Sequence, residues 1–241
     1  MRRTVSAEWL KLRRSRLALV LSALPILSLL IGCANYYFNQ TILQNEWYSL
    51  WTQVSLFYGE FFLPVLIAIC CAYVCRLEHM NNNWNAVLTT PKSIASVFLA
   101  KLVVVSGLIA MVQTFFIVLY VCAGLTLGLS FPPPVELFGW VVRGWIASVA
   151  ISAVQLMLSL RIRSFSAPIG IALCGVFVGL GFYVSKLGMF FPYSLLTIGM
   201  GVLSQESLSV AENSLFLATT ALFTMGFSGW AIRRLRRADV S

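Results

Sequence analysis

Charged side chains are scarce in this sequence. Only 10% of its 241 residues are charged and 59% are hydrophobic, whereas a typical soluble domain carries about 25% charged residues. A chain of this size therefore lacks the polar surface that a soluble fold requires. Its long apolar runs instead predict membrane-spanning helices, each of which needs about 20 mostly apolar residues. We expect an all-α integral membrane protein.

Side chains for catalysis and metal binding are scarce as well. The chain has one histidine, His79, and one aspartate, Asp239, which stands in the C-terminal tail. A membrane enzyme would need a catalytic set at membrane depth, such as paired aspartates or a serine with a histidine. No Gly-Lys-Ser/Thr element is present, so the chain has no Walker A loop for ATP. We expect no catalytic residue, no metal and no cofactor bound by this chain.

Six apolar runs predict transmembrane helices within a single transmembrane domain, residues 1–241. The expected spans are residues 17–37, 54–75, 94–125, 137–160, 166–185 and 214–232. A further apolar segment, residues 190–204, is too short to cross a hydrocarbon core of about 30 Å. We expect it to form a re-entrant helix on the outer side that docks against the bundle, because irregular backbone at membrane depth must pack on protein.

The basic residues orient the spans. All but two of the 17 lysines and arginines precede the first span, lie in or beside the connections after the second and fourth spans, or follow the last span. Because these residues accumulate on the cytoplasmic side, we expect both termini to be cytoplasmic. The same distribution argues against a nucleic-acid partner, which would need a basic patch on a solvated face.

Residues 1–16 predict an amphipathic helix on the membrane surface. Val5, Trp9 and Leu12 fall on one helical face, and basic residues crowd the remainder. We expect Trp9 to anchor this helix in the headgroup layer, with its basic side chains toward anionic lipid. A generic basic flank of the first span is the alternative. The expected basic anchors are Lys11, Arg13 and Arg14.

A second amphipathic helix is predicted at residues 77–89, between the second and third spans. Thr90-Pro91 ends it, because proline lacks a backbone donor and disfavours helix at the residue before it. Ser93 is a suitable cap for the span that follows. An exposed helix of this kind can dock into a groove of a partner protein or lie on the membrane. Its apolar stripe comprises Leu77, Met80, Trp84, Val87 and Leu88.

A few polar residues fall inside the expected spans. Glu60 and Arg143 lie at similar depth, in the outer third of the second and fourth spans. Charges inside a membrane face the bundle interior and usually pair, so we expect an ion pair or a shared polar cavity, with either a gating or a structural role. We expect Gln113 and Gln155 to bridge helices through hydrogen bonds, or to line a pathway.

Three local patterns resemble the ABC-2 class of ABC-transporter permeases. Glu8-Trp9-Leu10-Lys11-Leu12-Arg13 is similar to the E-x-x-K-x-x/R start of that class. Residues 78–88, followed by Thr90-Pro91 and Lys101-Leu102, resemble a stretch of its lantibiotic-immunity branch, as does Phe191-Pro192-Tyr193-Ser194. Together with the expected order of spans and amphipathic helices, the resemblance extends over the whole chain. No residue that recognises a ligand can be carried over from it.

The resemblance implies a permease subunit of the bacterial cell membrane. A separate ABC ATPase, present as two copies or a dimer that binds ATP and Mg, would dock on residues 77–89 as a coupling helix. A second permease, homologous or identical, would complete the pathway. The implied activity is export of a lantibiotic or bacteriocin, an amphiphilic cationic peptide, from the membrane of its producer. The alternatives are export of another amphiphile (an antibiotic, drug or lipid) and a membrane assembly protein without transport. The expected docking residues are Glu78, Met80, Asn81, Trp84 and Leu88.

Overall fold

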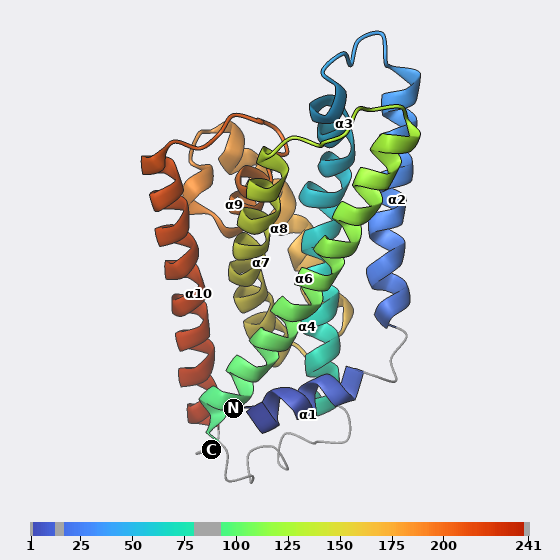
Figure 1. The fold of residues 1–241 in the computed structure, drawn as a ribbon. Helices are drawn as coiled ribbons and strands as arrows, with labels where there is room; N and C mark the ends of the chain where they lie inside the picture. Colours follow the sequence, from blue (N-terminus) through green and yellow to red (C-terminus); the bar gives the residue numbers. More distant parts are fainter. Residues whose placement is uncertain (1, 13–16, 80–92, 239–241) are drawn as a thin grey trace.

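The computed structural model describes residues 2–12, 17–79 and 93–238, and within them the chain is helical without strands (Figure 1). Six of the described helices are long and apolar enough to cross a membrane. The predicted all-α membrane fold is therefore confirmed. Helix α1 (Arg2–Leu12) lies across one end of the bundle, and the C-terminal end of α10 (Val210–Ala238) reaches the same end.

The spanning helices follow the expected order. They are α2 (Leu17–Phe38), the continuous run of α3 (Glu46–Ser55), η1 (Leu56–Phe62) and α4 (Leu63–His79), then α6 (Ile94–Thr126), α7 (Glu136–Arg161), α8 (Ser166–Val184) and α10. Ser93 caps α6, because its hydroxyl accepts a hydrogen bond from the backbone N–H of Ser96 at 3.3 Å, as predicted.

The second span begins earlier than expected, at Glu46 instead of residue 54. The additional turns form α3, whose polar residues, such as Glu46 and Gln53, interrupt the apolar pattern. In the fold, Trp47, Leu50 and Trp51 of this helix are buried, so α3 belongs to the bundle despite its mixed composition. Its continuation η1 is a π-helix that includes Glu60.

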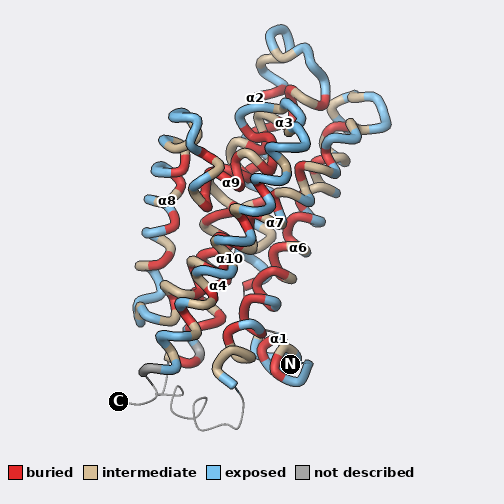
Figure 2. Tube along the Cα trace, turned by 90° about the vertical axis from the view of Figure 1, so that its left-hand side faces the viewer, coloured by how far each residue is buried: buried red, intermediate tan, exposed pale blue. Residues whose placement is uncertain are grey.

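Aromatic side chains fill the core at the end of the bundle opposite α1. Trp51 is fully buried, stacks on Trp140 with 5.2 Å between ring centroids, and donates a hydrogen bond from Nε1 to the Met200 carbonyl at 2.9 Å. Tyr58 stacks on Phe116 with 3.6 Å between ring centroids. These contacts join the second span to α6, α7 and the chain beyond α9 (Pro192–Gly199). Figure 2 shows the buried positions in the interior and the exposed positions on the outer faces.

Helix α9 lies inside the bundle at this same end (Figure 1). Proline stands at its first turn, where the missing N–H costs no helical hydrogen bond. Seven of its eight residues are buried, and the Ser194 hydroxyl donates to the Gly188 carbonyl of the preceding turn η3 (Gly188–Phe190) at 2.9 Å. A helix this short cannot span a bilayer, but it can present backbone and side-chain groups to the buried charges around it.

Candidate functional site

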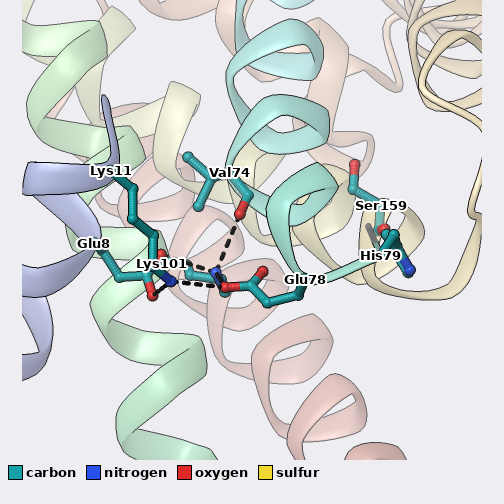
Figure 3. A network of polar contacts seen from close by, with 7 residues as sticks. All are labelled: Glu8, Lys11, Val74, Glu78, His79, Lys101 and Ser159. Carbon is teal, nitrogen blue, oxygen red and sulfur yellow. Dashed lines mark hydrogen bonds and ion pairs between the residues drawn. The ribbon is translucent and has the colours of Figure 1, made fainter. Parts of the chain in front are cut away.

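Two lysines and two glutamates form one network at the α1 end of the bundle (Figure 3). The Lys101 Nζ lies 2.5 Å from Oε1 of Glu78 and 2.9 Å from Oε2 of Glu8. The Lys11 Nζ lies 2.7 Å from Oε1 of Glu8 and 3.0 Å from Oε1 of Glu78. These four contacts are all the ion pairs within 4.0 Å between residues that the structure describes.

The network draws on three segments that are distant in sequence. Glu8 and Lys11 stand one turn apart on α1, Glu78 lies in the last turn of α4, and Lys101 lies in the third turn of α6. Lys101 is fully buried and also donates to the Val74 carbonyl at 3.2 Å. Buried charges persist only when they are paired and hydrogen-bonded. Each of the four groups has a partner of opposite charge and the set has no net charge, although Oε2 of Glu78 is buried without a hydrogen-bond partner among the described residues. The contacts join α1, α4 and α6 to one another.

The ion pairs also set the protonation of the α1 groups. Burial by itself would raise the pKa of Glu8, but the charges of Lys101 and Lys11 outweigh it, so the pKa of this carboxyl lies below its ordinary value. Burial would lower the pKa of Lys11, but its hydrogen bond to Glu8 and the charge of Glu78 raise that pKa above its ordinary value. Both groups are therefore charged at neutral pH.

The packing of α1 differs in part from the predicted surface helix. Its buried residues are Thr4 and Glu8, and Val5 and Leu12 are partly buried against the core, so α1 packs on the bundle through a face of mixed polarity. Trp9 is 40% exposed. Lys11 directs its ammonium to two carboxylates of the chain, although 36% of its side chain is exposed. The acidic partners could not be found from the pattern of apolar residues. Arg13 and Arg14 lie outside the described residues.

Only the start of the predicted docking helix lies in the described part of the chain. Glu78 is 2% exposed, and its carboxylate is paired with Lys11 and Lys101. The predicted contact of Glu78 with the ATPase stays a prediction. The neighbouring His79 ring contacts the Ser159 carbonyl of α7 through Nε2 at 2.8 Å. Met80, Asn81, Trp84 and Leu88 lie outside the described residues.

Glu60 and Arg143 do not form the expected ion pair. Each contacts α9 instead: Oε2 of Glu60 accepts a hydrogen bond from the Thr197 hydroxyl at 2.6 Å, and Nε of Arg143 donates to the Gly199 carbonyl at 3.3 Å. Glu60 is 3% exposed. Similar depth along two helices did not bring these side chains together, because a third element lies beside both. The missed partner, Thr197, is a common residue in an apolar segment and gave no signal in the sequence.

The two intramembrane glutamines behave differently from each other. Gln155 donates from Nε2 to the Tyr193 hydroxyl at 2.6 Å, and so forms the predicted bridge, here between α7 and α9. Gln113 is 2% exposed, yet neither its amide nitrogen nor its oxygen has a hydrogen-bond partner among the described residues. A buried amide without a partner costs free energy in the folded chain, so packing among the described residues does not explain why a polar residue stands at Gln113.

Six apolar spans with a neutral ion network at one end define a polytopic helical membrane protein. The family model described as ABC-2 family transporter protein matches residues 4–179. This range includes all four residues of the network. The chain belongs to this family and is a transport permease. No curated protein and no solved structure matches the chain. The ABC-2 class expected from the sequence is thus confirmed.

Proposed function

We propose that this chain is the permease subunit of an ATP-driven exporter and that a separate ABC ATPase dimer docks at the α1 end of the bundle, on the cytoplasmic side. The observation that carries this proposal is the network of Glu8, Lys11, Glu78 and Lys101. Glu78 lies at the start of the predicted coupling helix and Lys101 follows that helix in the sequence. The two residues are paired with Lys11 and Glu8 of α1.

The network offers a route by which a force on the coupling segment reaches the spans. Residues 80–92 leave α4 directly after its last turn and re-enter the described chain at Ser93, before α6. Glu78 on one side and Lys101 on the other are joined through buried atoms at 2.5 Å. A movement of the segment is therefore passed to α4 and α6 together, and α1 follows because Glu8 is bound to the same ammonium.

Within this proposal Glu78 supports the docking segment from behind. Its burial and its two lysine partners suit a positioning role. The contact with the ATPase is assigned to Met80, Asn81, Trp84 and Leu88 of the predicted helix. ATP and Mg belong to the ATPase, and a second permease, identical or homologous, completes the pathway.

We propose a lantibiotic or bacteriocin peptide as the substrate, removed from the membrane of the cell that makes it. The support is the resemblance of Phe191-Pro192-Tyr193-Ser194 to the immunity branch, together with the structural role of this motif. Pro192 begins α9, and Tyr193 and Ser194 are both hydrogen-bonded inside the bundle. The motif thus determines how α9 docks, close to the buried carboxylate of Glu60. The alternative substrate is another amphiphile, such as an antibiotic, a drug or a lipid.

Expression in a sensitive bacterium tests the substrate. The chain would be produced with its ATPase and sister permease, and the minimum inhibitory concentration of a panel of lanthionine peptides and bacitracin would be measured. A rise for at least one lanthionine peptide, abolished by a Walker A lysine substitution in the ATPase, supports the proposal. Unchanged sensitivity to the whole panel refutes the immunity function. A rise only for bacitracin or other unrelated amphiphiles favours the alternative.

A further inference from the structure

A cavity of about 250 Å³ lies between α7 and α10 at the end of the bundle that carries α1. Its position follows from the helix bounds, since both helices run in the same direction and their C-terminal ends meet there (Figure 1). The lining combines cationic and apolar groups, among them Met157, Leu160, Arg161, Trp230, Ala231 and Arg234.

The two arginines of this cavity, Arg161 and Arg234, have no acidic partner among the described residues. Neither guanidinium lies within 4.0 Å of a carboxylate in the part of the chain that the structure describes, and both side chains are exposed. The described acids at this end, Glu8 and Glu78, are occupied by lysines. Within the described part of the chain, the cavity therefore carries two positive charges without a carboxylate partner, and such a concave site is complementary to an anion.

Along each helix an apolar side chain is followed by an arginine, and this order matches the acyl chain and the phosphate of a lipid. Arg161 follows Met157 by four residues and Arg234 follows Trp230 by four residues, so each arginine lies one turn beyond an apolar side chain on the same face. Because both helices end at this side, the arginines lie nearer the membrane surface and the apolar residues nearer the hydrocarbon. Trp230 is 48% exposed and has the amphipathic ring that favours the headgroup layer. Ala231 at the cavity wall is small and leaves space for a chain.

We propose that this cavity binds one anionic phospholipid, with its phosphate between Arg161 and Arg234 and the start of an acyl chain against Trp230 and Met157. Arginine is suited to phosphate because its planar guanidinium offers a fork of donors. Basic cavities between spanning helices at a membrane surface are known to hold anionic headgroups. The site is separate from the Glu8–Lys11–Glu78–Lys101 network and does not depend on the identity of the exported substrate.

Native mass spectrometry of the full chain in detergent tests the site. Phosphatidylglycerol and phosphatidylcholine of equal acyl composition would be titrated separately. We expect phosphatidylglycerol to bind more tightly, by about fivefold for each arginine that it contacts. The variant R161Q/R234Q should lose this preference. The matched control R233Q/R236Q removes two exposed arginines of α10 that do not line the cavity, and it should keep the preference.

Further measurements distinguish a lipid site from a free phosphate site and from an interface between permeases. Glycerol 3-phosphate supplies the phosphate without acyl chains and should not displace the lipid at equal concentration. Full displacement would overturn the lipid assignment in favour of a free phosphate site. Equal binding of the two lipids by the unmodified chain overturns the proposal even if R161Q/R234Q fails to fold. A change in oligomeric state of R161Q/R234Q on size exclusion, with lipid preference unchanged, would instead assign the cavity to an interface between permeases.

Discussion

The ammonium of Lys101 and the carboxylate of Glu78 lie 2.5 Å apart, and both side chains are excluded from solvent. The two residues stand on opposite sides of residues 80–92 in the sequence. Their contact closes the ends of α4 and α6 on each other, and Glu8 brings α1 into the same contact. The ends of these three helices therefore cannot separate without exposing or uncoupling buried charges.

Loss of the Lys101 charge should destabilise the fold. K101M leaves the carboxylates of Glu8 and Glu78 with Lys11 as their remaining cation, and breaking a buried ion pair costs about 3–5 kcal/mol. The free energy of unfolding, measured by denaturant titration in mixed micelles, should fall by that amount. In a double-mutant cycle, K101M/E78Q should lose less stability than the sum of its single variants. Strictly additive losses would contradict a direct contact.

The α1 ion pairs predict how stability depends on pH. Because the pKa of Glu8 is lowered by folding, its contribution is complete above its ordinary pKa of 4.5 and is lost as pH falls through the lowered value. Because the pKa of Lys11 is raised, its contribution is complete below 10.5 and is lost as pH rises through the raised value. Between these limits the midpoint of thermal unfolding should vary little.

The control for the acidic pH range is E8Q. This variant removes the titrating carboxyl of Glu8, while Lys101 keeps its ion pair with Glu78. On lowering the pH from neutrality through the carboxyl range, the unfolding midpoint of E8Q should fall less than that of the unmodified chain. An identical fall in both proteins would show that Glu8 does not carry the acid dependence.

Removal of the Thr197 hydroxyl should affect Glu60. T197V keeps the shape of the side chain but leaves Oε2 of Glu60 buried without this donor, which costs about 1–3 kcal/mol. T114V is the matched control, since Thr114 is exposed and its hydroxyl bonds only to the Ala110 carbonyl of its own helix. Unfolding titrations of the two variants compare them directly. Equal losses would indicate that the hydrogen bond between Thr197 and Glu60 contributes nothing specific.

The docking of α9 depends on a small residue in α8. A Cβ at Gly175 would lie 2.7 Å from the Tyr193 ring, whereas a Cβ at Gly181 of the same helix would meet nothing within 4 Å. G175A should therefore destabilise the chain by about 1–3 kcal/mol through overpacking, and it should lower transport by displacing Tyr193. G181A should leave both unchanged. A G175A variant with normal stability and transport would mean that α9 tolerates displacement.

Local patterns predicted the helices well, because apolar runs and flanking basic residues report directly on a bilayer. The second span shows the limit: α3 carries Glu46 and Gln53, and only tertiary burial of Trp47 and Trp51 makes it part of the bundle. Propensity and hydropathy cannot include that burial before the fold is known.

The candidate site was predicted as residues but not as contacts. Glu8, Lys11, Glu78 and Lys101 all occur in the motifs quoted from the sequence, yet Glu8 and Lys101 are 93 positions apart and nothing local indicates that they meet. Glu60 and Arg143 illustrate the opposite error. Equal depth suggested a pair, but α9 supplies the hydrogen-bond partner of each side chain, Thr197 for Glu60 and Gly199 for Arg143.

The central claim is that a separate ABC ATPase docks on the segment that the network supports. The most direct measurement is the amount of ATPase that co-purifies with the affinity-tagged permease when both are expressed together, for W84A and for the unmodified chain, with K186A as a control on the opposite side of the membrane. We predict stoichiometric ATPase with the unmodified chain and K186A, and a severalfold loss with W84A at equal permease yield. Equal recovery of the ATPase with all three proteins would contradict the docking assignment.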